Sequence, residues 1–396
     1  MANNNQSKIY NARKMINGVL LSSLLTAALT ACGSSDTSGS PNSSSSSSEG
    51  SDVIKVVQIT PFSGAGASFG EWEDQAFTMA IENVNADGGI HGRKIEIEKV
   101  DSQSNPTIAV NLAQKMVNDD VVAAFATPLS TTTLAVLEVF KQAKVPHLTG
   151  GQDPVITSKG SDYIFRYNAN SRAYTKTAAD YVVNKKGWKK LAVISNSGAY
   201  GKGERDTFVE ALKSFTVTPV VEEVVTPDAK DFTAQLTNIK NANPEVLYIG
   251  AENIQSGLIV KQARALGMNA QIVGGSTLGS PVYVETAGVD VAEGTIFTTQ
   301  FIANSTEETR AFSKAFKEKY GIEANFNHAK AYDGAMMLIE AMNKAYPNID
   351  GESIRNALRE INFHGLTGDY KFDETGEGSE KAQMGIIKNG KPEVAE

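Results

Sequence analysis

Residues 54–117 read IKVVQITPFSGAGASFGEWEDQAFTMAIENVNADGGIHGRKIEIEKVDSQSNPTIAVNLAQKMV. A short apolar run, Val53–Thr60, opens this stretch, and a second run, Lys94–Val100, follows the intervening Glu71–Ala86. In the intervening segment, apolar residues recur at i, i+3, i+4 and i+7, which predicts an amphipathic helix. Asp87-Gly88-Gly89 ends this helix, because glycine readily adopts the left-handed cap conformation. The order strand, helix, strand predicts an α/β unit with parallel strands.

The same alternation continues through most of the remaining chain. Further strands are predicted at Val121–Ala126, His147–Thr149, Leu191–Ser195, Val217–Val225, Val246–Gly250, Gln271–Gly274 and Gly294–Thr299, and a further helix at Asn327–Ala345. These strands are hydrophobic on both faces, which is typical of a parallel sheet covered by helices on each side. The alternation restarts near Leu191, and the segment from Val53 to Glu396 is longer than one hydrophobic core usually serves. We therefore predict an α/β, doubly wound architecture in two similar lobes.

Cys32 is the only cysteine, and it follows a segment that is typical of export signals. A short basic region precedes a mostly apolar run, Ile16–Leu29, which is shorter than the about 20 residues of a membrane span. Leu29-Thr30-Ala31-Cys32 resembles the lipobox of bacterial lipoproteins, which implies acylation of the cysteine, for example with palmitate. Residues 1–31 are then a lipoprotein signal peptide, and residues 32–52 a lipidated cysteine with a serine-rich disordered linker. The alternatives are a cleaved secretory signal with an incidental cysteine, or a free thiol in the core.

Composition and motifs argue against several classes of protein. The net charge of −8 argues against nucleic acid or an anionic membrane as a partner. Gly64–Gly70 reads GAGASFG, but its third glycine falls one position late for a dinucleotide-binding fingerprint. We expect no hydrolase nucleophile elbow, and the four histidines are scattered without metal-ligand spacing. The chain is therefore predicted to be no enzyme and to hold neither a cofactor nor a metal.

Residues 54–117 resemble the start of type I periplasmic binding proteins, most closely those for leucine, isoleucine and valine and for other amino acids. Later stretches agree with this resemblance in the same order along the chain. They are LAVISNSGAYGKG at residues 191–203, VLYIGAENIQSGLIVKQARALGM at 246–268 and GLTGDYKFDETGE at 365–377. The resemblance covers about Val53 to Lys388.

The resemblance implies two Rossmann-like lobes that are joined by three hinge crossings and trap one small ligand between them. The crossings are expected near Tyr167–Asn170, Thr298–Phe301 and His364–Gly368. Lobe I is then 53–168 plus 300–364, and lobe II is 169–299 plus 365–396.

The predicted ligand residues of lobe I follow two strands of its sheet. Ser130 and Thr131 begin a helix, where hydroxyls, amides and the helix dipole favour an anion. The resemblance implies that Ser130 and Thr131 bind the α-carboxylate of an amino acid. The alternative is that they only cap the helix N-terminus. In the next loop, the resemblance implies that a carbonyl near Gly150 and the side chain of Gln152 meet the α-ammonium. The alternative for this loop is a glycine-rich turn.

In related proteins, the loop that corresponds to the one after Gln271–Gly274 in lobe II often carries an acidic residue that binds the ligand's α-ammonium. This sequence has Gly275-Ser276-Thr277 there, and Ser276 is retained as a ligand candidate. Glu252 follows the strand Val246–Gly250, where branched-chain binders tend to carry an aromatic residue. We expect Glu252 either to take over the ammonium or to contact a polar group on the ligand side chain. The alternative is a solvated acid at a helix N-terminus.

Aromatic side chains are expected to complete the pocket, because they cover apolar surface in a closing cleft. The candidates are Phe69, Trp72 and Tyr200. The alternative is that two of these three belong to the core of a lobe.

The resemblance also implies that the protein delivers its solute to an ABC permease. We expect a monomer that is anchored through lipid on the extracytoplasmic side, either in the periplasm or on the outer face of the plasma membrane. The alternative is a ligand-sensing lipoprotein of the same fold that feeds a signalling receptor.

Overall fold

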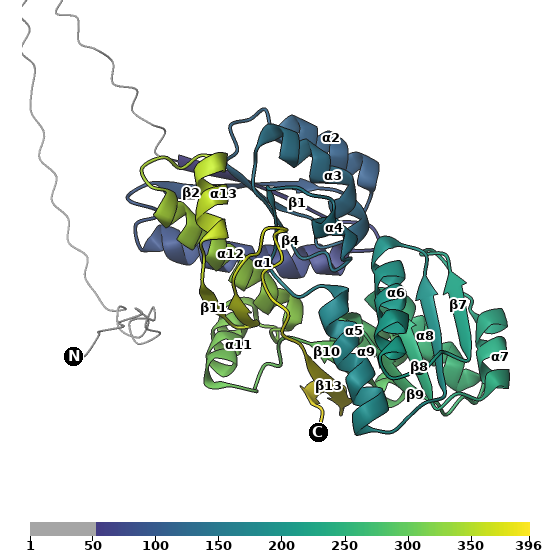
Figure 1. Cartoon of the computed structure of the whole chain (residues 1–396). Coiled ribbons are helices and arrows are strands. Elements are labelled where there is room, and N and C mark those ends of the chain that lie inside the picture. Colours follow the sequence, from purple (N-terminus) through teal and green to yellow (C-terminus); the bar gives the residue numbers. More distant parts are fainter. Residues whose placement is uncertain (1–52) are drawn as a thin grey trace, which may run out of the picture. The chain divides into compact units, whose positions relative to one another are not determined.

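The computed structural model describes residues 53–396 (Figure 1). The predicted signal peptide, Cys32 and the serine-rich linker lie outside the described residues. Within residues 53–396, no helix is both long and apolar enough to cross a membrane. The described chain forms two lobes, each built on a mainly parallel sheet with helices packed against it.

The first sheet is parallel throughout and has the strand order β2-β1-β3-β4-β5. Its strands are β1 (Val53–Thr60), β2 (Lys94–Asp101), β3 (Ala123–Ala126), β4 (His147–Thr149) and β5 (Ile164–Arg166). The helices between and after them are α1 (Ala67–Ala86), α2 (Pro106–Met116), α3 (Ser130–Ala143) and α4 (Val155–Ser158). Because β1 lies between β2 and β3, the strand order reverses there, and such reversals are where open α/β sheets bind ligands.

The second sheet has the strand order β14-β13-β10-β9-β8-β6-β7. Strands β6 to β10 are parallel to one another, and β13 and β14 are antiparallel additions at one edge. The strands are β6 (Leu191–Asn196), β7 (Val221–Val225), β8 (Val246–Gly250), β9 (Gln271–Gly274), β10 (Ile296–Thr299), β13 (Gln383–Lys388) and β14 (Lys391–Val394). Its helices are α5 (Ser171–Asp180), continued by a π-helical turn (Tyr181–Lys185), α6 (Ala199–Lys213), α7 (Thr233–Ala242), α8 (Asn253–Ala265), a 3-10 turn (Ser276–Gly279), α9 (Pro281–Ala287) and α10 (Val289–Ala292).

The last third of the chain returns to the first sheet before it completes the second. It contains α11 (Glu307–Tyr320), α12 (Phe326–Ala345), α13 (Gly351–Arg359) and the hairpin β11 (Phe363–Gly365) and β12 (Gly368–Tyr370). Helix α12 packs along α1, and Leu338 and Met342 share a core cluster with Phe77 and Phe125. The chain therefore passes between the two sheets three times. The predicted lobe limits at single residues stay predictions.

Alternating side chains of a central strand pack into two separate hydrophobic clusters, one on each face of the sheet. In β1, Ile54 and Val56 belong to one hydrophobic cluster, and Val57 and Ile59 belong to another. Strand β6 divides in the same way between the two clusters of the second lobe. Burial of each such side chain contributes about 1.5–3 kcal/mol. Helices cover both faces of each sheet, and this is why the central strands are continuously apolar in sequence.

Several predicted element boundaries differ from the structure. The strand predicted at Val217–Val225 begins only at Val221, because the amide of Val217 donates to the Leu212 carbonyl (3.2 Å) and closes the end of α6 instead. The strands predicted from Val121 and Gly294 begin two residues later, and the helix predicted from Glu71 begins at Ala67. None of these differences moves a strand end at which a ligand residue was predicted.

One glutamine joins all three segments that connect the two sheets. Gln300 follows β10, and its Oε1 accepts hydrogen bonds from the Ala169 amide (2.7 Å) and from the Tyr174 hydroxyl (2.6 Å). Its Nε2 donates to the carbonyl of Thr367 in the third connection (3.1 Å). Tyr370 adds a link between the third and first connections by donating to the Tyr167 carbonyl (3.0 Å). The connecting segments are therefore one hydrogen-bonded unit.

Candidate functional site

The predicted ligand residues of the two lobes meet at the carboxyl ends of the parallel strands. The side-chain amide of Gln152, after β4, donates to the Ser276 hydroxyl, after β9 (3.0 Å). The amide of Ala199, at the start of α6, donates to the Thr131 hydroxyl (3.4 Å). The loop after β4 and the start of α3 in the first lobe thus touch the loop after β9 and the start of α6 in the second.

Buried hydroxyls fix the two loops of the first lobe relative to each other. Thr133 Oγ1 lies 2.6 Å from Thr127 Oγ1 and 2.9 Å from Thr149 Oγ1. Ser130 Oγ accepts the amides of Gln152 (3.0 Å) and Asp153 (3.1 Å). Ser130 is the first residue of α3 and the N-cap is Leu129, so the alternative of a plain N-cap at Ser130 is wrong. The hydroxyl of Ser130 holds the second loop against the amide-rich start of α3, where the helix dipole favours an anion.

Gly150 lies over a buried ion pair that the sequence analysis missed. A Cβ added to Gly150 would lie 2.7 Å from Lys330 Nζ and 2.9 Å from Glu73 Oε1, so a side chain there would displace the ion pair. Lys330 Nζ lies 3.4 Å from Glu73 Oε1 and donates to the Gly150 carbonyl (3.5 Å). Tyr167 donates to the same Glu73 oxygen (2.9 Å). Burial raises the pKa of Glu73, and the ammonium of Lys330 opposes that rise.

In the second lobe, Glu252 and Tyr200 lie at the starts of α8 and α6, which follow the neighbouring strands β8 and β6. Glu252 is the N-cap of α8, but its side chain makes no capping bond and instead accepts from the side-chain amide of Asn196. Partial burial raises the pKa of Glu252, and its place at the start of α8 leaves the alternative of a solvated acid at a helix N-terminus open. Tyr200 is buried on the first turn of α6, with its hydroxyl 3.5 Å from Thr277 Oγ1.

Phe69 and Trp72 pack against each other in α1, edge to face, with ring centroids 5.7 Å apart. Trp72 also contacts the ring of His328 in α12, at 6.2 Å. Both indole contacts are therefore within the first lobe. A role for either ring against a ligand stays a prediction.

The sequence analysis also missed Glu204, a fully buried acid on α6, four residues after Tyr200. Its Oε2 accepts the Tyr248 hydroxyl (2.6 Å), and a Cβ added to Gly275 would lie 2.6 Å from this oxygen. Burial raises the pKa of Glu204 to about 7, and the Tyr248 hydrogen bond opposes that rise. The i, i+4 spacing from Tyr200 is the signal that places both side chains on one helix face. The loop after β9 lacks a carboxylate of its own, but Glu204 brings one against it.

The glycine-rich segment 66–70 reads Gly-Ala-Ser-Phe-Gly and does match the pattern of a hydrolase nucleophile elbow, so the expectation that no such pattern exists is wrong. The structure gives it another role. Residues 67–70 form the first turn of α1, and Ser68 Oγ accepts from the side-chain amide of Asn253 in the other lobe (3.3 Å). Ser68 therefore takes part in a contact between the lobes.

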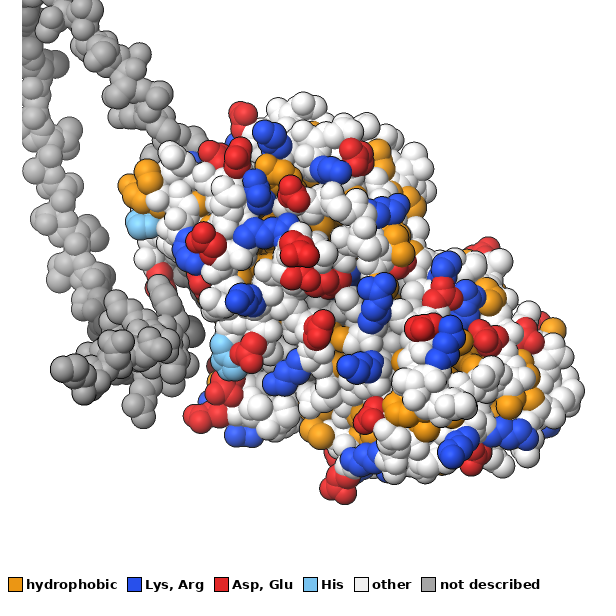
Figure 2. Space-filling model, in the orientation of Figure 1, with side chains coloured by type: hydrophobic (Ala, Val, Ile, Leu, Met, Phe, Trp, Pro, Cys, Tyr) orange, Lys and Arg blue, Asp and Glu red, His pale blue; other side chains and the backbone are white. Residues whose placement is uncertain are grey.

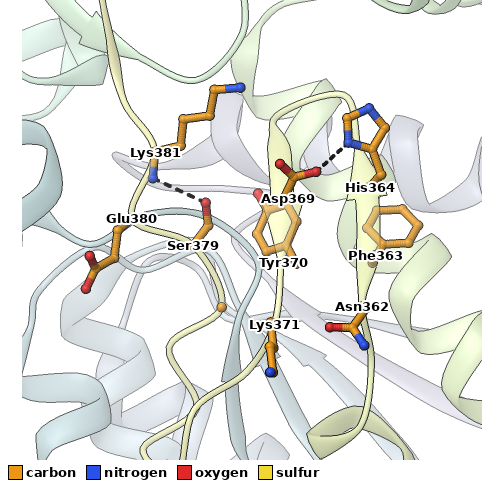
Figure 3. Close-up of a pocket in the computed structure, with 10 residues that line it drawn as sticks. Asn362, Phe363, His364, Asp369, Tyr370, Lys371, Ser379, Glu380 and Lys381 are labelled. Atoms are coloured by element: carbon orange, nitrogen blue, oxygen red, sulfur yellow. Dashed lines mark hydrogen bonds and ion pairs between the residues drawn. The ribbon is translucent and has the colours of Figure 1, made fainter.

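Within residues 53–396, no group of three or more His, Cys, Asp or Glu side chains is placed to hold a metal ion. A pocket of about 360 Å³ lies at the hairpin β11–β12 and the segment before β13 (Figure 3). None of the predicted ligand residues lines it. On the face shown in Figure 2, basic and acidic side chains are interspersed over both lobes.

Known proteins share this fold and sequence pattern. The pattern of the family described as "Periplasmic binding protein" matches residues 53–391. The chain is 31% identical over 331 residues to the Leu/Ile/Val-binding protein homolog 3 of Brucella melitensis biotype 1, which covers 82% of this chain and 88% of that protein.

Two solved structures extend this likeness to three dimensions. The branched-chain amino acid transporter substrate-binding protein of Streptococcus pneumoniae, in complex with isoleucine, has a TM-score of 0.81 and 28% identity, with 87% of this chain and 99% of that chain covered. The ABC transporter solute-binding protein of Rhodopseudomonas palustris BisB5, in complex with 3,4-dihydroxybenzoic acid, has a TM-score of 0.78 and 25% identity, with 85% and 93% covered.

Proposed function

The chain belongs to the periplasmic binding protein family, and from this premise we propose that it captures a small amino acid between its two lobes for an ABC importer. Members of this family bind solutes in transport systems, so the chain is a solute-binding protein and not an enzyme. Membership also indicates an extracytoplasmic location. The names of its relatives, which bind leucine, isoleucine and valine, support an amino acid as the ligand.

The observation that carries the proposal is the direct contact of the two predicted ligand loops, from Gln152 Nε2 to Ser276 Oγ (3.0 Å). A molecule that touches both loops is small, because the loops are within one hydrogen bond of each other. On the first-lobe side, the start of α3 suits a carboxylate, since its first amides have no partner inside the helix. On the second-lobe side, the carboxyl groups of Glu204 and Glu252 lie on elements that contact the first lobe, which suits an ammonium group. An amino acid carries both charges.

The ligand acts by stabilising the closed arrangement of the lobes. The contacts of Gln152 with Ser276 and of Ser68 with Asn253 are formed only when the lobes meet. Each neutral hydrogen bond contributes about 1 kcal/mol, so such contacts alone bias closure weakly. A full reversal from 99:1 open to 99:1 closed takes about 5.5 kcal/mol of differential affinity, which the ligand provides by contacting both lobes at once.

The finer parts of the proposal rest on the sequence. Acylation of Cys32 would anchor the protein to a membrane, with residues 33–52 between the anchor and the two lobes. The protein would act as a monomer, and its closed lobes would together form the surface that contacts the permease. A tethered binding protein meets its permease by local encounter instead of a search through the whole compartment.

A thermal-unfolding screen of the protein from residue 53 onward tests the amino acid assignment. A ligand at about 100 times its dissociation constant adds about 2.7 kcal/mol to the free energy of unfolding, which is a clear shift of the melting temperature. We expect at least one L-amino acid to give this shift. If 3,4-dihydroxybenzoate or another carboxylate without an amine stabilises the protein and no amino acid does, the assignment is wrong.

Ser130→Ala then tests the carboxylate end of the site. The variant removes the acceptor of two loop amides, and we expect at least a tenfold loss of affinity for the best amino acid by calorimetry. Thr132→Ala is the matched control, because its buried hydroxyl bonds only to the Leu129 carbonyl (2.9 Å) in its own helix turn. Equal losses in both variants would remove Ser130 from the site.

A further inference from the structure

Two carboxylates of the second lobe, the fully buried Glu204 and the partly buried Glu252, have no cation beside them in the described chain. Glu204 accepts from Tyr248, and Glu252 accepts from Asn196. Within residues 53–396, neither acid forms an ion pair with a lysine, arginine or histidine. Tyr200 is buried near Gly275, as Glu204 is, and the charges of both acids raise the pKa of its hydroxyl beyond the effect of burial.

Two other acids, the buried Glu73 and the partly buried Glu377, are paired with cations, whereas the buried Asp333 has no cation and accepts the amides of Leu366 and Thr367 instead. Glu73 lies 3.4 Å from Lys330, and Glu377 lies 3.0 Å from Arg166, whose side chain is fully buried. This is the usual pattern, because an isolated buried charge loses its hydration without compensation. Glu204 and Glu252 have no such cation, and they lie on α6 and at the start of α8, which both contact the first lobe.

Glu204 is flanked by two contacts to Gln152 of the first lobe. On one side is Gly275, whose neighbour Ser276 accepts from the Gln152 side chain. On the other side is Ser171, whose amide donates to the Gln152 carbonyl (2.9 Å). Glu204 Oε1 and Ser171 Oγ are buried beside each other, but neither has a hydrogen-bond partner of good geometry. Glu204 thus lies close to both contacts that Gln152 makes with the second lobe.

We propose that the ligand carries two positively charged groups, and that Glu204 and Glu252 each compensate one of them. The class that fits is an amino acid with a basic side chain, in which one carboxylate meets the start of α3 and two cations meet the second lobe. Glu204 serves the end near Gln152, and Glu252 serves the end near Asn196. This inference rests on the proposed function and narrows its ligand class.

Charge coupling gives a signature that a structural role of Glu204 would not produce. The titratable groups that face Glu204 are tyrosines: Tyr200 on its own helix, Tyr174 on α5 and Tyr248 on β8. A cation beside Glu204 lowers the pKa of the carboxyl from about 7, so binding releases a proton below that pH. Affinity for a basic amino acid should therefore rise as the pH increases from 5 to 8, and Glu204→Gln should remove most of that rise.

L-lysine and L-norleucine form the matched ligand pair, because they share a carbon chain and differ in the terminal ammonium. We expect lysine, ornithine or arginine to bind at least tenfold more tightly than norleucine by calorimetry at pH 8. Glu252→Gln should reduce this preference to less than threefold. Ser195→Ala is the control variant, since Ser195 is fully buried near Glu204 but carries no charge, and its affinity for lysine should match that of the wild type.

The possible outcomes separate this inference from the proposed function. If norleucine or leucine binds as tightly as every basic amino acid, the second cation is refuted while amino acid capture stands. If a basic amino acid binds but the pH dependence persists in Glu204→Gln, the role of Glu204 is refuted. If cadaverine, which lacks the carboxylate, binds as tightly as lysine, or if no amino acid binds, the amino acid assignment itself is refuted.

Discussion

Replacement of Gln300 by leucine tests whether the three connections between the lobes act as one unit. Leucine has a similar volume but neither donates nor accepts a hydrogen bond. The variant leaves three buried partners behind: the amide of Ala169, the hydroxyl of Tyr174 and the carbonyl of Thr367. All three residues are almost fully buried, so water does not readily replace the lost amide.

The cost follows from the number of groups left unsatisfied. A buried polar group that loses its partner costs about 1–3 kcal/mol, so three such groups predict a loss of at least about 3 kcal/mol. That exceeds the typical effect of a single substitution, which is about 1 kcal/mol. Gln262→Leu is the matched control. Gln262 also bonds one amide and one carbonyl, of Phe232 and Lys230, but within one lobe and nearer the solvent.

Urea unfolding followed by circular dichroism measures the free energy of unfolding of both variants. We expect Gln300→Leu to lose at least about 3 kcal/mol and Gln262→Leu clearly less. A loss below about 1 kcal/mol for Gln300→Leu would refute the reasoning, because the three connections would then not depend on the glutamine that joins them.

Three further predictions follow from buried charges and from the sequence. The pKa of Glu204 is raised from 4.5 to about 7, so the protonated side chain stabilises the fold at low pH and this contribution is lost as the pH rises through about 7. Relative to Glu204→Gln, the free energy of unfolding of the wild type in urea should fall by about 3 kcal/mol between pH 4 and pH 8. Parallel pH profiles of the two proteins would contradict this. Lys330→Met should lower the free energy of unfolding by about 3–5 kcal/mol, because it leaves Glu73 buried without its cation. The double variant with Glu73→Leu should recover most of that loss. Additive losses in the double variant would contradict the pairing. Cys32→Ala should move the full-length protein from the detergent phase to the aqueous phase on phase partition, and unchanged partition would exclude the lipid anchor.

The layout of the fold was predictable from sequence, because a strand that is buried on both faces consists of an unbroken run of mostly apolar residues. Strands such as Val246–Gly250 have such a run, and their predicted limits agree with the structure. The edge strand β7 does not, because the first four of its five residues alternate between partly buried and exposed, and its predicted start was wrong. The two lobes were predictable for the same reason, since the alternation of strands and helices restarts near Leu191.

The parts of the candidate site that depend on distant residues were not predictable. Gly150 is a plain glycine in sequence, and only the fold shows that Lys330 and Glu73, far away along the chain, occupy the space of a side chain there. Ser130 was predicted as a helix-start residue, but its hydroxyl acts on loop amides more than 20 positions away. Glu204 carried a local signal, the spacing from Tyr200, but its burial comes from β8 and α5.

Capture of an amino acid between closing lobes is the central claim, and a distance between the lobes tests it most directly. Cys32 is the only cysteine, so Glu71→Cys and Ile254→Cys in a Cys32→Ala background place two spin labels specifically. Both positions are exposed, and they flank the contact between Ser68 and Asn253. Double electron–electron resonance should show a broad or long distance distribution without ligand, and a single shorter distance with a saturating amino acid. An unchanged distribution in the presence of an amino acid that calorimetry shows to be bound would contradict the account.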